Sequence, residues 1–176
     1  MHKEHKVFLK IYKENFTFET MKIKLFFLFT FLFFLQFNSQ LKQGVFYKIW
    51  YVNDGDTFMV RDENLVKYKI RLIGIDAPES VNWGKKKVQL FGYESKMYLR
   101  TFLYQKKVRF EFDITKLDFY GRTLAYVYLE DGTFLNKNLV ENGYAKVYTF
   151  PPNIKYVEVF KKKKKLARGK KLGLWK

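Results

Sequence analysis

Three extended segments separated by two short polar turns constrain the fold of this chain more than any other feature. Val45 to Val52, Thr57 to Arg61 and Leu65 to Ile75 are rich in β-branched and aromatic residues, which favour strands. The turns between them, Asn53-Asp54-Gly55-Asp56 and Asp62-Glu63-Asn64, have the residues typical of hairpins. Such short connections join antiparallel neighbours. The segment therefore predicts three consecutive antiparallel strands.

Two more strands and an intervening helix are expected downstream. Tyr93 to Tyr104 has the pattern of a helix, with an acidic residue in its first turn. Val108 to Ile114 and Leu124 to Leu129 have strand patterns, joined by the polar turn Lys116 to Arg122. Five strands with a helix between the third and fourth are typical of a small Greek-key barrel of the oligonucleotide-binding (OB) type.

Two helices are expected to complete the domain. The first follows Asp131-Gly132, with Thr133 as its N-cap and Asn142-Gly143 as its stop. The second runs from Ile154 to about Arg168, after which three apolar residues are expected to close the core: Leu172, Leu174 and Trp175. The predicted fold class is an all-β core with helices (α+β), a five-stranded OB-fold barrel plus three α-helices.

The first 40 residues resemble a targeting segment. The basic Met21-Lys22-Ile23-Lys24, the apolar run from Leu25 to Leu35 and the polar Asn38-Ser39-Gln40 have the order of a secretory signal. Residues 1–20 are then an extended n-region or a start assigned upstream of Met21. We interpret residues 21–40 as a signal peptide, although an uncleaved membrane anchor remains the alternative. We therefore expect a folded domain at residues 41–176 that is secreted or associated with the cell envelope.

Composition narrows the chemistry that the folded part can perform. The chain has 34 basic and 17 acidic residues, a net charge of +17, which favours a polyanionic partner such as nucleic acid or an anionic membrane. It contains no cysteine, which excludes disulfides, thiol nucleophiles and thiolate zinc sites. The two histidines, His2 and His5, lie in the leader. Hydrolytic chemistry would therefore depend on carboxylates, arginines, hydroxyls and a hard metal ion.

The candidate site begins at the end of the third expected strand. In Ile70 to Glu79 an alternating apolar pattern stops at Asp76, and Pro78 prevents further pairing in a central strand. The strand end thus brings together an arginine and two carboxylates. Taken alone, Asp76-Ala77-Pro78-Glu79 is also ordinary turn chemistry.

Three short motifs, in order and at characteristic spacing, give the chain its resemblance to a known family. They are Asp54-Gly55-Asp56-Thr57, Arg71 with Asp76-Ala77-Pro78-Glu79, and Asp118-Phe119-Tyr120-Gly121-Arg122. With these motifs the chain resembles the staphylococcal nuclease (thermonuclease) family over residues 45–175. The resemblance implies a calcium-dependent phosphodiesterase, an endonuclease that hydrolyses DNA and RNA and leaves 3′-phosphate ends. No protein partner is implied, and we expect a monomer.

The resemblance also assigns roles to individual residues. It implies that Ca²⁺ is bound by the carboxylates of Asp56 and Asp76 and by the backbone carbonyl of Ala77, where the family commonly has threonine. It implies that Glu79 orients the attacking water. The matching phosphate-gripping arginines are Arg71 and Arg122, for which lysine would be a poor substitute because a planar fork suits a phosphate.

Substrate contacts match the family less closely. Tyr120 matches a family tyrosine near the substrate phosphate, whereas Phe119 replaces a family lysine. Thr149 and Pro151 stand where the family has base-stacking tyrosines, and the neighbouring Tyr148 is the candidate for stacking on a base.

Two other interpretations stay open at this stage. Asp54 is interpreted as a turn residue rather than a metal ligand. Degenerate domains of this fold bind nucleic acid without cutting it, so the alternative function is a catalytically inactive nucleic-acid-binding module. A pure binder has no need of two aspartates, one glutamate and two arginines together, and this chain has all five.

Overall fold

The computed structural model describes residues 20–28, 40–82 and 87–176. The chain divides into two units, Met1–Gln40 and Leu41–Lys176. In the first unit, residues 20–28 are helical. The expectations for residues 1–19 and 29–39, which include most of the apolar run of the predicted signal segment, lie outside the described residues. In the described ranges, no helix combines the length and the apolar character needed to cross a bilayer.

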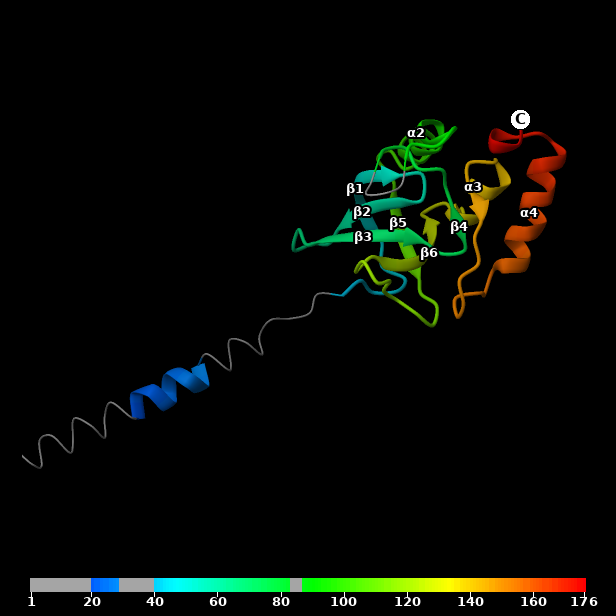
Figure 1. Ribbon diagram of the computed structural model, residues 1–176. Helices are drawn as coiled ribbons and strands as arrows, with labels where there is room; N and C mark the ends of the chain where they lie inside the picture. The colour runs from blue at the N-terminus through cyan, green and yellow to red at the C-terminus, as the bar shows by residue number, and fades with distance from the viewer. Residues whose placement is uncertain (1–19, 29–39, 83–86) are drawn as a thin grey trace, which may run out of the picture. The chain divides into compact units, whose positions relative to one another are not determined.

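Five strands close into a barrel in the order β1-β2-β3-β6-β5 (Figure 1). β1 (Tyr47–Asp54), β2 (Thr57–Arg61) and β3 (Lys67–Leu72) form the predicted antiparallel series. β5 (Lys107–Glu111) pairs with β1 and with β6 (Thr123–Leu129), and a parallel contact between β3 and β6 closes the barrel. The predicted five-stranded barrel is confirmed.

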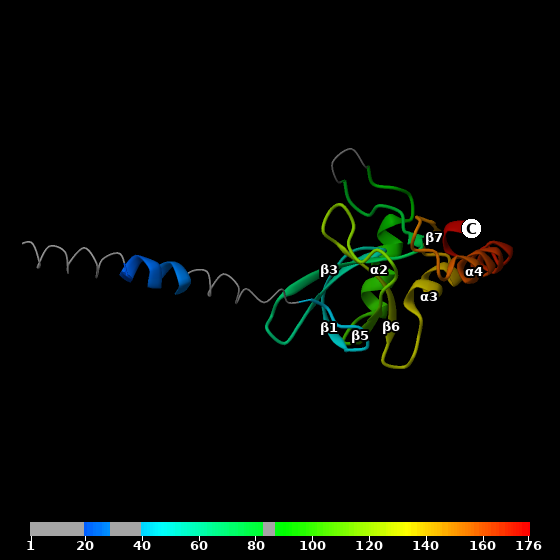
Figure 2. The same cartoon turned by 90° about the horizontal axis from the view of Figure 1, so that it is seen from below.

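Three α-helices and a terminal 3₁₀ turn accompany the barrel in the second unit. They are α2 (Gly92–Phe102), α3 (Leu135–Glu141), α4 (Val157–Gly169) and η1 (Gly173–Trp175). Figures 1 and 2 show α3 between the barrel and α4, with the C-terminus beside α4. The predicted set of three helices is therefore present, and α4 forms an outer edge of this unit.

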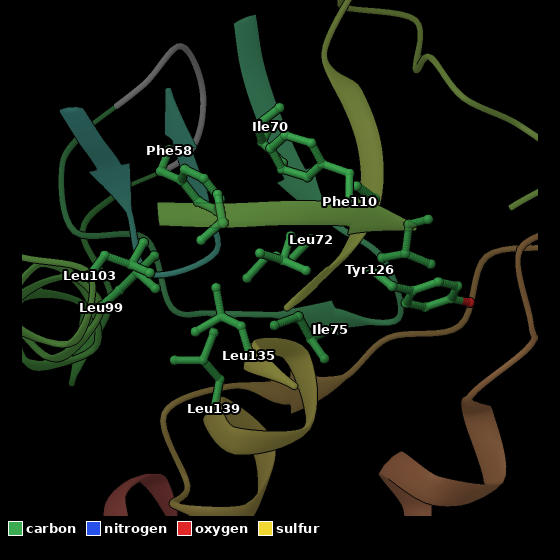
Figure 3. Close-up of a cluster of buried hydrophobic side chains, with 14 of the residues drawn as sticks. Phe58, Ile70, Leu72, Ile75, Leu99, Leu103, Phe110, Tyr126, Leu135 and Leu139 are labelled. Atoms are coloured by element: carbon green, nitrogen blue, oxygen red, sulfur yellow. The ribbon is translucent and has the colours of Figure 1, made fainter. Parts of the chain in front are cut away.

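The barrel interior and the helices share one apolar core (Figure 3). Most of its largest fully buried side chains lie in β2, β3, β5, β6, α2, α3 and α4 or directly after α2; they include Phe58, Ile70, Leu72, Phe110, Tyr126, Leu99, Leu103, Leu135, Leu139 and Phe160. Each buried leucine or phenylalanine contributes about 2 kcal/mol relative to exposure. This core fixes the ends of the strands from which the candidate site is built.

The third predicted strand, Leu65 to Ile75, is wrong in its extent. β3 ends at Leu72, and a turn at Ile73-Gly74 sends the chain into β4 (Ile75–Asp76), which pairs with β7 (Lys146–Val147) in a separate two-stranded sheet. Gly74 adopts a φ of +79°, and a Cβ there would lie 2.5 Å from the ring of Phe160. Glycine is the residue that fits this position, and it allows the chain to bend sharply between Arg71 and Asp76.

Several other predicted boundaries are also wrong. α3 begins at Leu135 with Phe134 in the N-cap position, and Thr133 instead donates its backbone N–H to Asp131 in the preceding turn. α4 begins at Val157 rather than Ile154, because the chain first forms a bridge between Phe150 and Asn153.

Two further corrections concern exposed apolar residues. The strand predicted over Val108 to Ile114 ends at Glu111, and the Ile114 side chain is exposed. The predicted core plug Leu172, Leu174 and Trp175 is only partly buried, and its backbone instead bonds the end of α3 through Leu174 N–H and Gly143 C=O at 2.9 Å. An apolar residue at a chain end can pack on the surface of the core without entering it.

Candidate active site

The β2–β3 hairpin and the turn into β4 bring Asp56, Arg71 and Asp76 together. Arg71 lies opposite Thr57 in the β2–β3 ladder, and the N–H of Leu72 donates to the backbone C=O of Asp56 at 3.1 Å. These backbone contacts place the Arg71 side chain beside Asp56. The turn at Gly74 then returns the chain, so that Asp76 reaches the same guanidinium.

Arg71 bridges two carboxylates. Its Nη1 contacts Asp56 Oδ1, and its Nη2 donates to Asp76 Oδ1 at 2.7 Å and to the carbonyl of Ile75 at 3.3 Å. Burial alone would lower the pKa of Arg71, but the charges of Asp56 and Asp76 outweigh burial and raise it. The guanidinium is therefore permanently charged and fixed in orientation.

The Asp56 carboxylate is buried, with only 4% of its side chain exposed. Its Oδ1 accepts from the hydroxyl of Thr57 at 2.9 Å, and its Oδ2 accepts from the backbone N–H of Ala77 at 2.7 Å. Hydrogen bonds and the ion pair together compensate for burying this charge. The contact with Ala77 also ties the segment after β4 to the start of β2.

The Arg71 guanidinium balances the charge of only one of the two carboxylates that it contacts. One guanidinium faces two carboxylates, Asp56 and Asp76, and the latter side chain is 46% exposed. Within the described ranges, histidine, cysteine, aspartate and glutamate do not gather in groups of three or more as a preformed cluster. The donors that converge here are carboxylate oxygens, which suit a hard cation such as Ca²⁺. The donor set therefore fits the predicted metal, with one guanidinium now occupying the point where the two carboxylates meet.

Glu79 lies next to Asp54, close to the Asp56 turn. Asp54 Oδ1 accepts from the N–H of Gly55 at 2.9 Å and of Ser80 at 3.2 Å, so Asp54 ties its own turn to the segment after Glu79. Burial raises the pKa of Asp54, and the neighbouring Glu79 and Asp56 carboxyls add to the rise, while bonds from Ser80 and Gly55 oppose it. Asp54 thus lies close to two other acidic groups, Glu79 and Asp56.

Arg122 lies directly before β6 and lines the same groove as Arg71. The parallel β3–β6 pairing places Leu124, two residues after Arg122, opposite Arg71. Arg122 Nε donates to Asp118 Oδ2 at 2.6 Å, and its backbone N–H donates to Asp118 Oδ1 at 2.9 Å. Asp118 thereby orients the second guanidinium as the aspartates orient the first.

A groove of about 610 Å³ contains both arginines. It is also lined by three other predicted residues, Asp76, Tyr120 and Tyr148. The structure thus brings five of the eight predicted residues into one groove. Of the other three, Asp56 and Ala77 are buried, with Asp56 in contact with Arg71 and with the Ala77 N–H, and Glu79 lies beside Asp54.

Exposed aromatic and apolar side chains form the rim of this groove. Among its lining residues, Phe119 is 97% exposed, Phe150 68%, Tyr120 65% and Tyr148 52%. Such a gathering of large apolar side chains on a surface marks a binding site for an apolar or aromatic group. A groove lined by both guanidiniums and aromatic rings has the chemistry to bind a phosphate and a flat aromatic group together.

Three buried polar residues that sequence reasoning missed position the site. The side chain of Asn136 in α3 donates to the carbonyl of Ile73 at 2.9 Å and accepts from the N–H of Val127 at 3.0 Å, so it fixes the turn that follows β3. Asn153 exchanges two bonds with the backbone of Thr115, at 2.9 and 2.8 Å, across the groove wall. Ser95 bonds the carbonyl of Tyr144 at 2.7 Å. Polar residues inside otherwise apolar patterns are the signal that could have indicated them.

Comparisons with known proteins find a matching family model and several similar proteins. The family model of staphylococcal nuclease homologues matches residues 69–176. The chain is 38% identical over 133 residues to a thermonuclease of Staphylococcus intermedius, which covers 76% of this chain and 77% of that protein. It is 39% identical over 129 residues to a thermonuclease of Staphylococcus hyicus, with 73% and 75% covered. It is also 36% identical over 124 residues to the SPbeta prophage-derived endonuclease YokF of Bacillus subtilis, covering 69% of this chain and 41% of that protein.

Proposed function

We propose, since this chain belongs to the staphylococcal nuclease family, that it is a nuclease that hydrolyses phosphodiester bonds of DNA and RNA. The observation that carries the proposal is the single groove that Arg71 and Arg122 both line, with Asp76 beside the first arginine. Planar guanidiniums bind phosphate oxygens in pairs. The thermonucleases and endonuclease to which the chain is similar support the same activity.

The two arginines stabilise the charge that develops on the phosphate during cleavage. Each guanidinium is oriented before substrate binds, Arg71 by two aspartates and Arg122 by Asp118. Preorganised donors of this kind contribute about 2.7–4 kcal/mol each to stabilisation of the transition state. Both arginines thus serve the chemical step as well as substrate binding.

A calcium ion belongs to the proposal. Asp56, Asp76 and the backbone carbonyl of Ala77 would hold it. When bound, Ca²⁺ would act as a Lewis acid on the phosphoryl oxygens. The protein's contribution is to hold two carboxylates around one guanidinium, that of Arg71.

Glu79 would orient the attacking water. Its backbone is firmly placed: its carbonyl accepts from the N–H of Gln89 at 2.9 Å, and its N–H donates to the side chain of Gln89 at 3.3 Å. Gly92 packs so closely that a Cβ there would lie 2.2 Å from the Glu79 carbonyl oxygen. Attack on phosphorus with the 5′ oxygen as leaving group gives a 3′-phosphate end.

The aromatic rim favours unpaired nucleotides. Tyr120 and Tyr148 would contact the sugar-phosphate and the base of a bound strand, and the exposed Phe119 adds an apolar surface beside them. Bases can stack on such rings only when they are not already stacked in a duplex. We therefore expect single strands and frayed duplex ends as the preferred substrates. We also propose that the enzyme is a monomer.

Cleavage by matched arginine variants tests the proposal. Wild type should convert a 5′-labelled single-stranded oligonucleotide into fragments that end in 3′-phosphate. Arg122→Ala should lose at least a hundredfold in cleavage rate, whereas Arg100→Ala, which removes an exposed arginine of α2, should retain it. A wild-type protein that binds the oligonucleotide but never cleaves it would be the inactive binding module instead.

Export of the enzyme is a separate part of the proposal. The basic residues at Lys22 and Lys24 followed by the apolar run support a signal peptide over residues 21–40, and hence a secreted or envelope-associated nuclease. Amino-terminal sequencing of protein from the culture medium should find a mature end near Gln40 or Leu41. Recovery of the protein only in membranes, with residues 21–40 intact, would identify an anchor.

A further inference from the structure

More than half of the net charge of the chain lies in its last 18 residues. Residues 159–176 contain nine basic residues and no acidic residue, against a net charge of +17 for the whole chain. The nine are Lys161, Lys162, Lys163, Lys164, Lys165, Arg168, Lys170, Lys171 and Lys176. Like charges one helical turn apart destabilise a helix by about 0.2–0.5 kcal/mol a pair. This concentration works against the stability of α4 and suggests a role outside folding.

Four of these residues form one defined surface. Lys161, Lys164, Lys165 and Arg168 line a shallow groove of about 430 Å³ along α4. Their spacing of three and four residues places them on the same face of the helix. Lys161 pairs with Glu158 of the same helix at 2.7 Å, whereas Lys163 pairs with Glu141 of α3 at 2.6 Å and attaches the helix to the rest of the domain. We call the four residues the α4 basic face.

Trp175 stiffens this face. The ring of Trp175 lies 5.1 Å from the guanidinium carbon of Arg168 and 6.0 Å from the ammonium of Lys164. The 3₁₀ turn that carries the ring is itself fixed by the bond from Leu174 N–H to the Gly143 carbonyl. Cations packed against an aromatic ring lose less freedom when they bind a ligand. The face is therefore a partly preorganised anion-binding surface.

The residues of the α4 basic face follow those of the active groove in the sequence. Phe150, Pro151, Pro152 and Asn153 line the groove, and α4 begins four residues later at Val157. A helix of 13 residues extends for about 20 Å. The outer position of α4 beside the C-terminus (Figure 1) leaves its length accessible to a large ligand. A strand that leaves the groove can therefore follow the helix for several phosphates.

We propose that the α4 basic face is an exosite for the phosphodiester backbone of the nucleic-acid substrate, outside the catalytic groove. The inference rests on the proposed nuclease function for its choice of polyanion. The exosite increases affinity for long strands and makes binding strongly salt-dependent, while the chemistry in the groove is unaffected. An anionic membrane is the other polyanion that such a face could meet.

A charge-matched pair of quadruple variants tests the exosite in the full-length chain. The exosite variant changes Lys161, Lys164, Lys165 and Arg168 to Gln. The control variant changes four residues that do not line either groove, Lys42, Lys48, Lys96 and Arg100, to Gln and removes the same charge. Circular dichroism confirms that each variant is folded.

Binding of a 30-nucleotide single strand is measured with a chelator present, so that the result does not depend on cleavage. The exosite variant should bind at least tenfold more weakly than wild type at 50 mM salt. Its slope of log affinity against log salt should be smaller by about 0.7 for each phosphate that the variant no longer neutralises. The control variant should bind within about threefold of wild type. For a dinucleotide, which fills only the groove, both variants should match wild type in binding and in any cleavage.

Three results would overturn the exosite. Equal weakening by both variants would show a general effect of net charge, and unchanged binding by the exosite variant would show that α4 does not touch the strand. Loss of binding to vesicles containing phosphatidylglycerol, with DNA binding unchanged, would assign the face to a membrane. Binding is measured without cleavage, so the two proposals can fail separately. If the wild-type protein cleaves nothing but the exosite variant still binds tenfold more weakly, the exosite stands and only the nuclease function is refuted.

Discussion

Removing the guanidinium of Arg71 should destabilise the fold and make the protein more responsive to calcium. In Arg71→Ala the Asp56 carboxylate, 4% exposed, loses its charge partner but keeps bonds from Thr57 and Ala77. Breaking a buried ion pair by deleting one partner costs about 3–5 kcal/mol. The two remaining hydrogen bonds reduce this cost, and Asp76, being 46% exposed, adds less than about 1 kcal/mol. We expect a net loss of about 2–3 kcal/mol.

Calcium should offset part of this loss. In the wild-type protein the two carboxylates share the Arg71 guanidinium, whereas in the variant they face each other without a cation. A cation that binds the folded state stabilises it in proportion to the logarithm of its concentration over Kd. Millimolar Ca²⁺ should therefore raise the unfolding free energy of Arg71→Ala by more than that of wild type.

Urea unfolding followed by tyrosine and tryptophan fluorescence measures both effects, with and without calcium. Arg122→Ala is the matched control, because the guanidinium that it removes pairs with Asp118 and not with Asp56 or Asp76. An Arg71→Ala protein as stable as wild type in chelator, or equal stabilisation of the two proteins by calcium, would refute this role of Arg71.

Single contacts give three further predictions. Gly74→Ala should cost about 3 kcal/mol of stability in urea unfolding, because the φ of +79° is strained for alanine and its Cβ would meet the Phe160 ring; an unchanged midpoint would contradict the turn. Burial alone would raise the pKa of Glu111, but hydrogen bonds from Lys155, Tyr156 and Tyr128 outweigh burial and lower the pKa below 4.5. The ionised Glu111 therefore stabilises the folded state above pH 4.5, and this stabilisation is lost as pH falls through the folded pKa. Glu111→Gln should lose about 2 kcal/mol at pH 7 and flatten the stability profile below pH 4.5; a profile parallel to wild type would exclude the effect. Phe119→Lys should bind single-stranded DNA severalfold more tightly at low salt and with a steeper salt slope, and weaker binding in a filter assay would instead assign Phe119 a stacking role.

Local patterns predicted the first half of the barrel because short connections join β1, β2 and β3. The first three strands are successive neighbours in sequence, so their apolar alternation and their turns were enough to predict the pairing. The arginine and the carboxylates lie between Arg71 and Glu79 in one continuous stretch of sequence, so their proximity could also be predicted. The structure confirms the five-stranded barrel.

Long-range contacts determined what the sequence patterns could not reveal. The break after Leu72 depends on pairing of Ile75 with Val147, far along the chain, and on the ring of Phe160 beside Gly74. Asn136 bonds the backbone at Ile73 from another element and carries no pattern that identifies its partner. Thr133 had the composition of an N-cap, but it lies in the turn at Asp131, and Phe134 takes the N-cap position of α3. Tertiary contacts thus override local preference at the positions that shape the site.

Digestion of single-stranded DNA with and without calcium is the most direct measurement of the proposed chemistry. The purified chain is incubated with an end-labelled strand in Ca²⁺ and, in parallel, in a chelator, and the ends of the fragments are identified. Fragments that form only with calcium and end in 3′-phosphate are expected from Asp56, Asp76, Glu79 and the two arginines. Intact DNA that remains bound to the protein in calcium would contradict the nuclease function, and equal cleavage in the chelator would contradict the metal site.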